Sequence, residues 1–125
     1  RDGNDVVVFA CGIMVDKALE AANQLSSVGI EVAVVNIYSL KPIDGETVAK
    51  FAETAGFIVT AENHTVNGGL GDAVAAELSA RQILVHHKKV ALNDEFAEGS
   101  STPYLMKKYG LDTADIVMAI KAADL

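Results

Sequence analysis

With 125 residues, half of them apolar and 22% charged, the chain has the size and composition of one folded domain. Its formal net charge of −7 argues against a nucleic-acid binder, which needs clustered Lys and Arg, and its longest apolar run (6–15) is too short to cross a bilayer. The single cysteine, Cys11, excludes an internal disulfide and favours a reducing, cytoplasmic compartment.

The first part of the chain alternates between strand-like and helix-like segments. The run Val6–Ala10 is β-branched and aromatic, which is typical of a parallel strand covered on both faces. Between 15 and 25 the apolar residues recur every three or four positions, which predicts a helix that ends at Gly29. Strand character returns over 30–37, and Asp44 is expected to cap a second helix through its side chain.

The second part continues this alternation. A third strand is predicted over 57–61, followed by a polar, glycine-rich loop and a helix over 72–80. A weaker strand pattern covers 88–92. A helix over 102–110 begins with a proline in its first turn, and Thr113 is expected to cap the last helix.

Strands that alternate with helices through short connections predict a three-layer α/β/α domain with a mostly parallel sheet of four to five strands. The segment 83–85 fits either the preceding helix or the following strand. The flavodoxin-like strand order 2-1-3-4 is the simplest that covers both faces of the sheet. In that order, Gly12 and the loop 62–71 become neighbours at the carboxyl edge of the sheet, where α/β proteins usually bind ligands.

The glycine-rich loop is the first candidate site. Its three glycines, Gly68, Gly69 and Gly71, allow a tight turn and close packing, and we favour that interpretation over an anion site formed by free N–H groups at a helix start. Gly12 stands alone after the first strand, so the dinucleotide-binding fingerprint is absent. The loop also lacks the Gly-Lys-Ser/Thr ending of a phosphate-binding P-loop.

Titratable residues near this loop give further candidates. Glu62 and His64 could form a general acid/base pair, although hydrogen bonds at an interdomain or intersubunit contact are the favoured alternative because no nucleophile accompanies them. Cys11 at the end of a strand is more typical of a small core residue than of a nucleophile. His86 and His87 do not form a metal site, since adjacent strand residues diverge.

Four motifs in the same order, which together cover nearly the whole chain, resemble the C-terminal domain of the transketolase family. They are residues 6–25 with the Cys11-Gly12 strand end, the Leu-Lys-Pro-Ile-Asp turn at 40–44, the Glu-Asn-His to Gly-Gly-Leu-Gly loop at 62–71, and the segment 94–111.

The resemblance implies an enzyme that uses thiamine diphosphate and a divalent cation, Mg or Ca, to transfer a two-carbon ketol unit between sugar phosphates, as in the pentose phosphate pathway. It also implies that the N-terminal and middle domains hold the cofactor, so that residues 1–125 form one non-catalytic domain, a piece of a longer chain or of a split transketolase. We therefore expect no catalytic, cofactor or metal residue here. The expected partners are those two domains and a second copy of the cytoplasmic, homodimeric enzyme.

Two alternatives remain at this point. The same domain occurs in 1-deoxyxylulose-5-phosphate synthase and in the beta subunits of 2-oxoacid dehydrogenases, and the substrate-binding residues that distinguish these enzymes lie mostly outside this domain. A different class of protein, an independent small-anion or nucleotide-binding module, would use the crevice beside Gly12 and residues 68–71.

Overall fold

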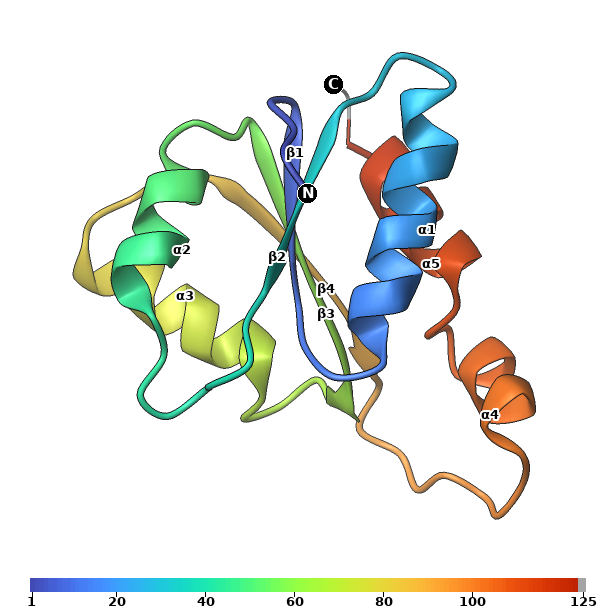
Figure 1. Ribbon diagram of the computed structural model, residues 1–125. Coiled ribbons are helices and arrows are strands. Elements are labelled where there is room, and N and C mark those ends of the chain that lie inside the picture. The colour runs from blue at the N-terminus through green and yellow to red at the C-terminus, as the bar shows by residue number, and fades with distance from the viewer. Residues whose placement is uncertain (124–125) are drawn as a thin grey trace.

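A parallel sheet lies between two layers of helices (Figure 1) in the computed structural model, which describes residues 1–123. The strands follow the order β2-β1-β3-β4, and each neighbouring pair is parallel, as the flavodoxin-like order predicted. The strands are β1 (Val6–Ala10), β2 (Val32–Asn36), β3 (Phe57–Thr65) and β4 (His86–Leu92). The helices are α1 (Met14–Ser26), α2 (Gly45–Ala52), α3 (Leu70–Ala80), α4 (Thr102–Lys108) and α5 (Thr113–Lys121).

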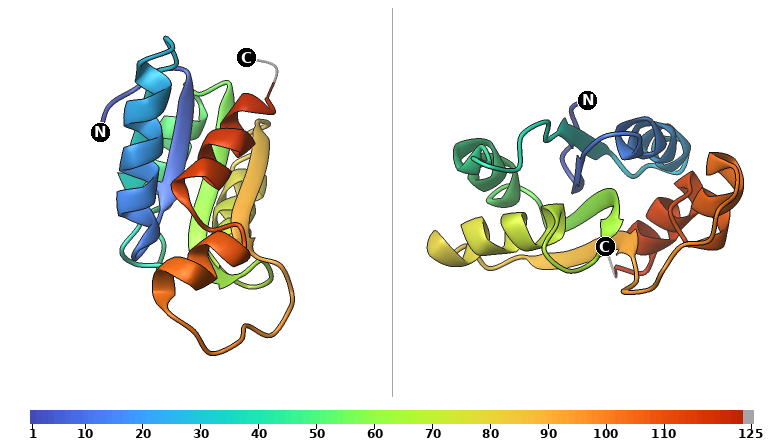
Figure 2. Two further views of the ribbon diagram at one scale, coloured as in Figure 1. Left: turned by 90° about the vertical axis from the view of Figure 1, so that its right-hand side faces the viewer. Right: turned by 90° about the horizontal axis from the view of Figure 1, so that it is seen from below.

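The two faces of the sheet are covered by different helices. Figure 2, seen from below, shows α2 and α3 on one side of the strands and α1 and α5 on the other. Every residue of β1 is buried, and its side chains alternate between the two cores: Val8 packs with α1 and α5, whereas Phe9 packs with α2 and α3. The uninterrupted apolar run of the central strand therefore reflects burial on both faces, as its sequence indicated.

The sequence correctly predicted where several helices begin or end. Gly29 has a φ of +84° after α1, and the N–H of Ile30 donates to Leu25 O at 3.1 Å, as in a left-handed helix cap. Asp44 caps α2, and Gly110 follows α4 with a φ of +70°.

The predicted cap of the last helix was wrong by one residue. Asp112 caps α5 in a reciprocal capping box with Asp115. The hydroxyl of Thr113 instead donates to Glu20 Oε2 of α1 at 2.6 Å. The side chain predicted to cap α5 is therefore used in a contact between α5 and α1.

The largest differences from the predicted boundaries surround the glycine-rich loop. β3 runs on to Thr65 and not only to Ala61, because an irregular register lets Thr65 pair with Leu92. Helix α3 begins at Leu70, two residues before the predicted start at Asp72.

The last strand is also longer than predicted. β4 begins at His86, since its first two residues pair with Phe57 and Ile58 of β3. Residues 83–85 belong to neither a helix nor a strand, although Ile83 and Val85 pack against the core beneath α3.

The first residues of the chain lie along the outer edge of β2. The N–H of Val34 donates to Arg1 O at 3.0 Å, and the amino group of Arg1 donates to Val34 O at 3.1 Å, the exchange typical of an antiparallel pair. Among the described residues, no helix is both long and apolar enough to cross a membrane.

Candidate functional site

The connections that follow the four strands meet at one end of the sheet, which we call the carboxyl edge (bottom of Figure 1). They are residues 11–13, 37–44, 66–69 and 93–101. The edge brings Gly12 next to the end of β3, as predicted: Cys11 N–H donates to Ala61 O at 3.2 Å, and a Cβ on Gly12 would lie 3.4 Å from Asn63 Oδ1.

The carboxylate of Glu62 occupies the start of α3. The side chain is 1% exposed, and its two oxygens accept hydrogen bonds from the backbone N–H groups of Leu70, at 2.6 Å, and Gly71, at 3.0 Å. A negative charge is stabilised at this end of a helix by the unpaired N–H groups and the helix dipole. The protein thus supplies its own anion to the helix start, which explains why α3 begins at Leu70.

The three loop glycines have separate structural reasons. Gly68 has a φ of +77°, a conformation that L side chains rarely adopt. A Cβ on Gly69 would overlap the Glu62 carboxylate and lie 2.8 Å from His64 Nδ1. A Cβ on Gly71 would lie 2.7 Å from the aliphatic part of Lys89. The geometry therefore supports the tight-turn interpretation, and two of the N–H groups that an external anion would use are already hydrogen-bonded.

A second set of contacts, which the sequence did not indicate, joins the glycine-rich loop and the start of α3 to β4. Lys89 of β4 forms an ion pair with Asp72 and donates a hydrogen bond to Val66 O at 3.3 Å. Asp72 also accepts the backbone N–H of Gly68, and these two bonds, the lysine first, lower the pKa of Asp72. Lys89 lies on another strand, so no local pattern could have indicated this pairing.

Glu62 and His64 do not share the hydrogen bond that an acid/base pair requires. His64 Nδ1 is 3.9 Å from Glu62 Oε2 and 2.9 Å from Thr65 O. Because a carbonyl oxygen only accepts, Nδ1 carries the proton in the neutral ring. His64 is therefore oriented by a backbone carbonyl next to it, and its side chain is about half exposed.

Burial and neighbouring charges shift the pKa values of the other titratable candidates, Cys11 and His87. Burial, and then the nearby Glu62 carboxylate, raise the pKa of the Cys11 thiol, which disfavours the thiolate that a nucleophile needs. His87 forms a hydrogen bond with Thr60 at 3.0 Å, and burial, then Lys89, lower its pKa to about 4. Within residues 1–123, no three His, Cys, Asp or Glu side chains group in a way that could hold a metal ion.

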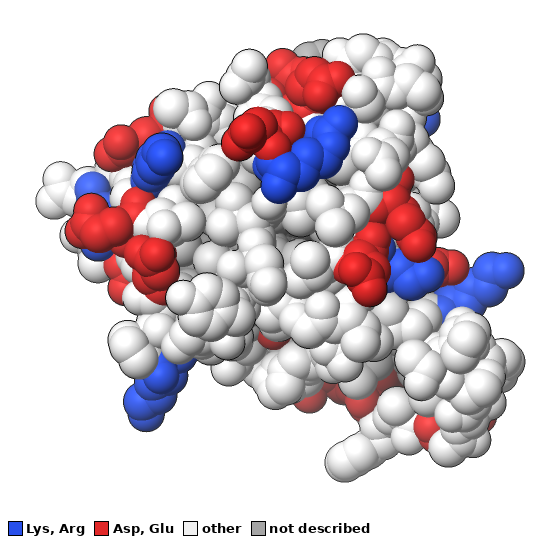
Figure 3. Space-filling model, in the orientation of Figure 1, with Lys and Arg blue, Asp and Glu red and all other residues white. Residues whose placement is uncertain are grey.

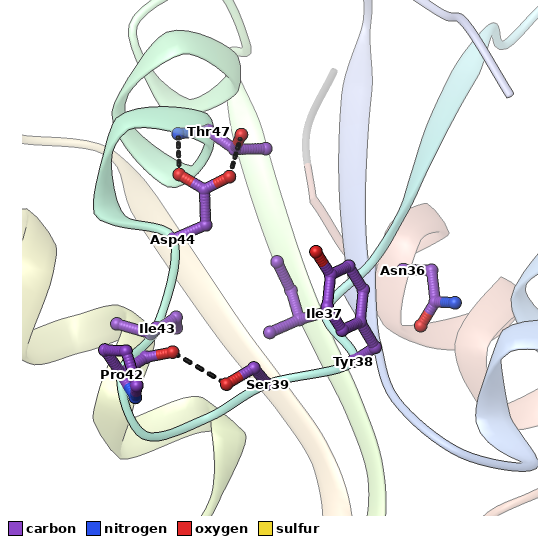
Figure 4. Close-up of a pocket in the computed structure, with 8 residues that line it drawn as sticks. All are labelled: Asn36, Ile37, Tyr38, Ser39, Pro42, Ile43, Asp44 and Thr47. Carbon is purple, nitrogen blue, oxygen red and sulfur yellow. Dashed lines mark hydrogen bonds between the residues drawn. The ribbon is translucent and has the colours of Figure 1, made fainter.

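The carboxyl edge also has two hollows that the sequence did not indicate. One, with a volume of about 500 Å³, lies beyond the end of β2 under the exposed ring of Tyr38 (Figure 4). Asp44 is the one carboxylate among the described residues that line it. This side chain accepts hydrogen bonds from the N–H and the hydroxyl of Thr47, which lower the pKa of Asp44. The other, about 230 Å³, lies beside α4 and is lined mainly by apolar residues such as Ile13 and Leu105.

Comparison with known proteins defines the class of this chain. The model of the family "Transketolase, C-terminal domain" matches residues 1–116. The chain therefore belongs to the transketolase C-terminal domain family, and the resemblance noted in the sequence is confirmed.

Individual relatives narrow the comparison. The 6-deoxy-6-sulfo-D-fructose transketolase subunit of Clostridium sp. (strain MSTE9) is 44% identical over 95% of this chain, and a 1-deoxy-D-xylulose-5-phosphate synthase of Syntrophotalea carbinolica is 36% identical over 97%. A solved structure titled "Split gene transketolase, inactive beta4 tetramer" is 46% identical, with a TM-score of 0.89 over 98% of this chain. The chain spans 37%, 19% and 39% of these three relatives.

Proposed function

We propose that this chain is the C-terminal, non-catalytic domain of a thiamine-diphosphate-dependent transketolase that transfers a two-carbon ketol unit between sugar phosphates. The observation that carries the proposal is the likeness to a split-gene transketolase chain over 98% of this chain with a TM-score of 0.89. A transketolase subunit is also 44% identical, and both relatives extend well beyond the part that this chain matches.

The geometry of the carboxyl edge supports a role in assembly and not in chemistry. A bound diphosphate would use N–H groups at a helix start, but Glu62 already occupies those of Leu70 and Gly71. The described residues also lack a metal-binding cluster. They therefore do not fit thiamine diphosphate with Mg or Ca, and we assign that site to the N-terminal and middle domains of the enzyme, which this domain would support in a cytoplasmic homodimer.

The first test is the intact mass of the native protein, measured together with what co-purifies with it. We expect either a chain several-fold longer than this one or a chain that co-purifies with a thiamine-diphosphate-binding partner. Ketol transfer by that assembly should depend on added thiamine diphosphate and stop when the divalent cation is chelated. A native chain of this length with no partner, or micromolar binding of thiamine diphosphate to this domain alone in calorimetry, contradicts the proposal.

One sibling activity is supported by a specific observation. A 1-deoxy-D-xylulose-5-phosphate synthase is 36% identical over 97% of this chain, a likeness not far below that of the transketolase subunit. The product decides between them: the native assembly should transfer a ketol unit between sugar phosphates, whereas formation of 1-deoxyxylulose 5-phosphate would assign it to the synthase.

A further inference from the structure

Large apolar side chains are exposed unevenly over the two ends of the sheet. Connections at the amino edge, where the strands begin, expose Val28 and Leu84. The carboxyl edge and the adjoining α4 expose more of them, and two are aromatic residues with almost no burial: Tyr38 at 91% and Phe96 at 103%. The full carboxyl-edge set is Ile13, Tyr38, Leu40, Phe96 and Tyr104.

These exposed residues lie in the connections after several different strands and do not belong to one continuous segment. Ile13 follows β1, Tyr38 and Leu40 follow β2, and Phe96 lies in the long connection after β4. His64, near the end of β3, adds a half-exposed ring at this edge. Figure 3, in the side view of Figure 1, shows uncharged surface over the centre of the molecule and charged side chains above it, at both sides and along its lower border. Exposed aromatic residues beside hollows are typical of interface hot spots.

The charges beside Phe96 indicate the chemistry of a partner. Asp94 and Glu95 precede it in an exposed segment, and within the described part of the chain neither forms an ion pair. A second copy of this chain placed on the same edge by a two-fold axis would put both acidic segments into one interface. A partner surface with an apolar pocket and a rim of Lys or Arg complements them.

We propose that the carboxyl edge is the surface on which the cofactor-binding part of the enzyme docks, with Tyr38 and Phe96 as its anchors. The inference rests on the proposed function. The occupant is argued from the charges above and from the relatives: the transketolase subunit and the split-gene transketolase contain this domain as only 37% and 39% of their length, so most of each chain lies outside the part described here.

The first experiment is hydroxyl-radical footprinting of the native, full-length assembly, read by mass spectrometry. Tyr38 and Phe96 should be oxidised at least about tenfold more slowly than exposed residues of the same type, because the partner covers them. Leu84 at the amino edge is the internal control and should react as a free side chain, since it is fully exposed here. Oxidation of Tyr38 and Phe96 at the free rate overturns the proposal.

A matched pair of double variants tests the same surface by affinity, within the full-length protein. Where the cofactor-binding part is a separate polypeptide, Tyr38→Ser with Phe96→Ser should weaken its association by roughly 30-fold or more, as measured by sedimentation or native mass spectrometry. Val28→Ser with Leu84→Ser at the amino edge should change it by less than about twofold. All four side chains are exposed, so each variant should keep the circular dichroism and Tm of the parent.

The outcomes separate this inference from the proposed function. If the parent protein forms a thiamine-diphosphate-dependent enzyme and only the amino-edge variant dissociates, the docking surface is wrong and the function stands. If the carboxyl-edge variant alters self-association of the domain and not partner binding, the occupant is a second copy and the proposal is overturned. If the parent protein shows neither a cofactor-binding partner nor ketol transfer, the proposed function itself fails.

Discussion

Helices α2 and α3 both begin at the carboxyl edge, yet their starts are built in different ways. The Asp44 carboxylate precedes α2 directly and accepts the N–H of Thr47 at 3.0 Å and its hydroxyl at 2.7 Å. The start of α3 has no such local cap, and Gly69 before it has no side chain to offer. Its acceptor is Glu62, buried on β3 and eight or nine residues earlier in the chain.

The two helix starts therefore depend on different parts of the fold for their stability. The Asp44 cap is exposed and depends on residues three positions apart, so it survives changes elsewhere in the fold. The Glu62 cap requires a buried charge, and its stability depends on both N–H groups being present and on Gly69 leaving room for the carboxylate. Damage to the α3 start should therefore have the larger effect.

The most damaging change should be Glu62→Ala. It leaves the N–H groups of Leu70 and Gly71 without an acceptor in a buried position, and we expect the free energy of unfolding to fall by roughly 3 kcal/mol or more. Urea denaturation measures the loss, and hydrogen exchange should show that these two amides lose protection. Glu95→Ala, at an exposed position, is the control and should leave both unchanged. Equal stability of the two variants would remove the distinction between the helix starts.

A second substitution, in the glycine-rich loop, tests the same contact of Glu62 with the start of α3. In Gly69→Ala the added methyl group overlaps the Glu62 carboxylate, which cannot move away because it is buried and hydrogen-bonded. We expect a loss of roughly 2 kcal/mol by urea denaturation. Gly99→Ala makes a matched control, since a Cβ there meets no atom within 4 Å. A Gly69→Ala protein as stable as the control would mean that the carboxylate is not held as described.

The dependence of stability on pH should test the surroundings of His87, which lies on β4 and is affected by the charge of Asp72 in α3. The pKa of His87 is lowered to about 4 in the folded protein, below the ordinary value of 6.5, so the unfolded chain binds more protons between these values. The stability due to His87 is therefore present above pH 6.5 and is lost as the pH falls towards 4.

The slope from one proton is at most about 1.4 kcal/mol per pH unit, and solvent screening of the partly exposed ring reduces it. Denaturation between pH 7 and pH 4 in the parent and in His87→Gln measures this slope, which should be shallower in the variant. An NMR titration in which His87 changes charge near pH 6.5 would contradict the expected direction.

Asp44→Ala should have the smallest effect, a Tm lower by a few degrees, because water can replace an exposed cap. Hydrogen bonds from Thr47 lower the pKa of Asp44, so its contribution is present above the ordinary value of 3.8 and is lost only as the pH falls below it. Thermal unfolding at pH 7 and at pH 3 should show the variant and the parent converging at the lower pH. Asp94→Ala, in the exposed connection after β4, is the control.

The sequence predicted much of the fold because the governing signals are local or periodic. The continuous apolar run of β1, the three-and-four spacing of α1 and the positive-φ glycine at Gly29 each reflect a constraint of nearby backbone and burial. Right-handed crossovers leave few strand orders, and the simplest one that covers both faces of the sheet was correct. That strand order also predicted that Gly12 lies near the glycine-rich loop.

The chemistry within that site was decided by contacts between distant segments. Glu62 and His64 are near neighbours in the sequence, yet one is buried as a helix cap and the other is half exposed. The register between β3 and β4 shifts between Ala61 and Thr65, in the stretch that holds both residues. In the sequence Lys89 was only one residue of the predicted strand 88–92, and its pairing with Asp72 depends on β4 lying beside β3. By itself, the sequence determined the elements, their order and the family, because these depend on local propensity and burial pattern. Only the tertiary structure decided which carboxylate meets which N–H group, since that depends on how residues far apart in the chain are brought together.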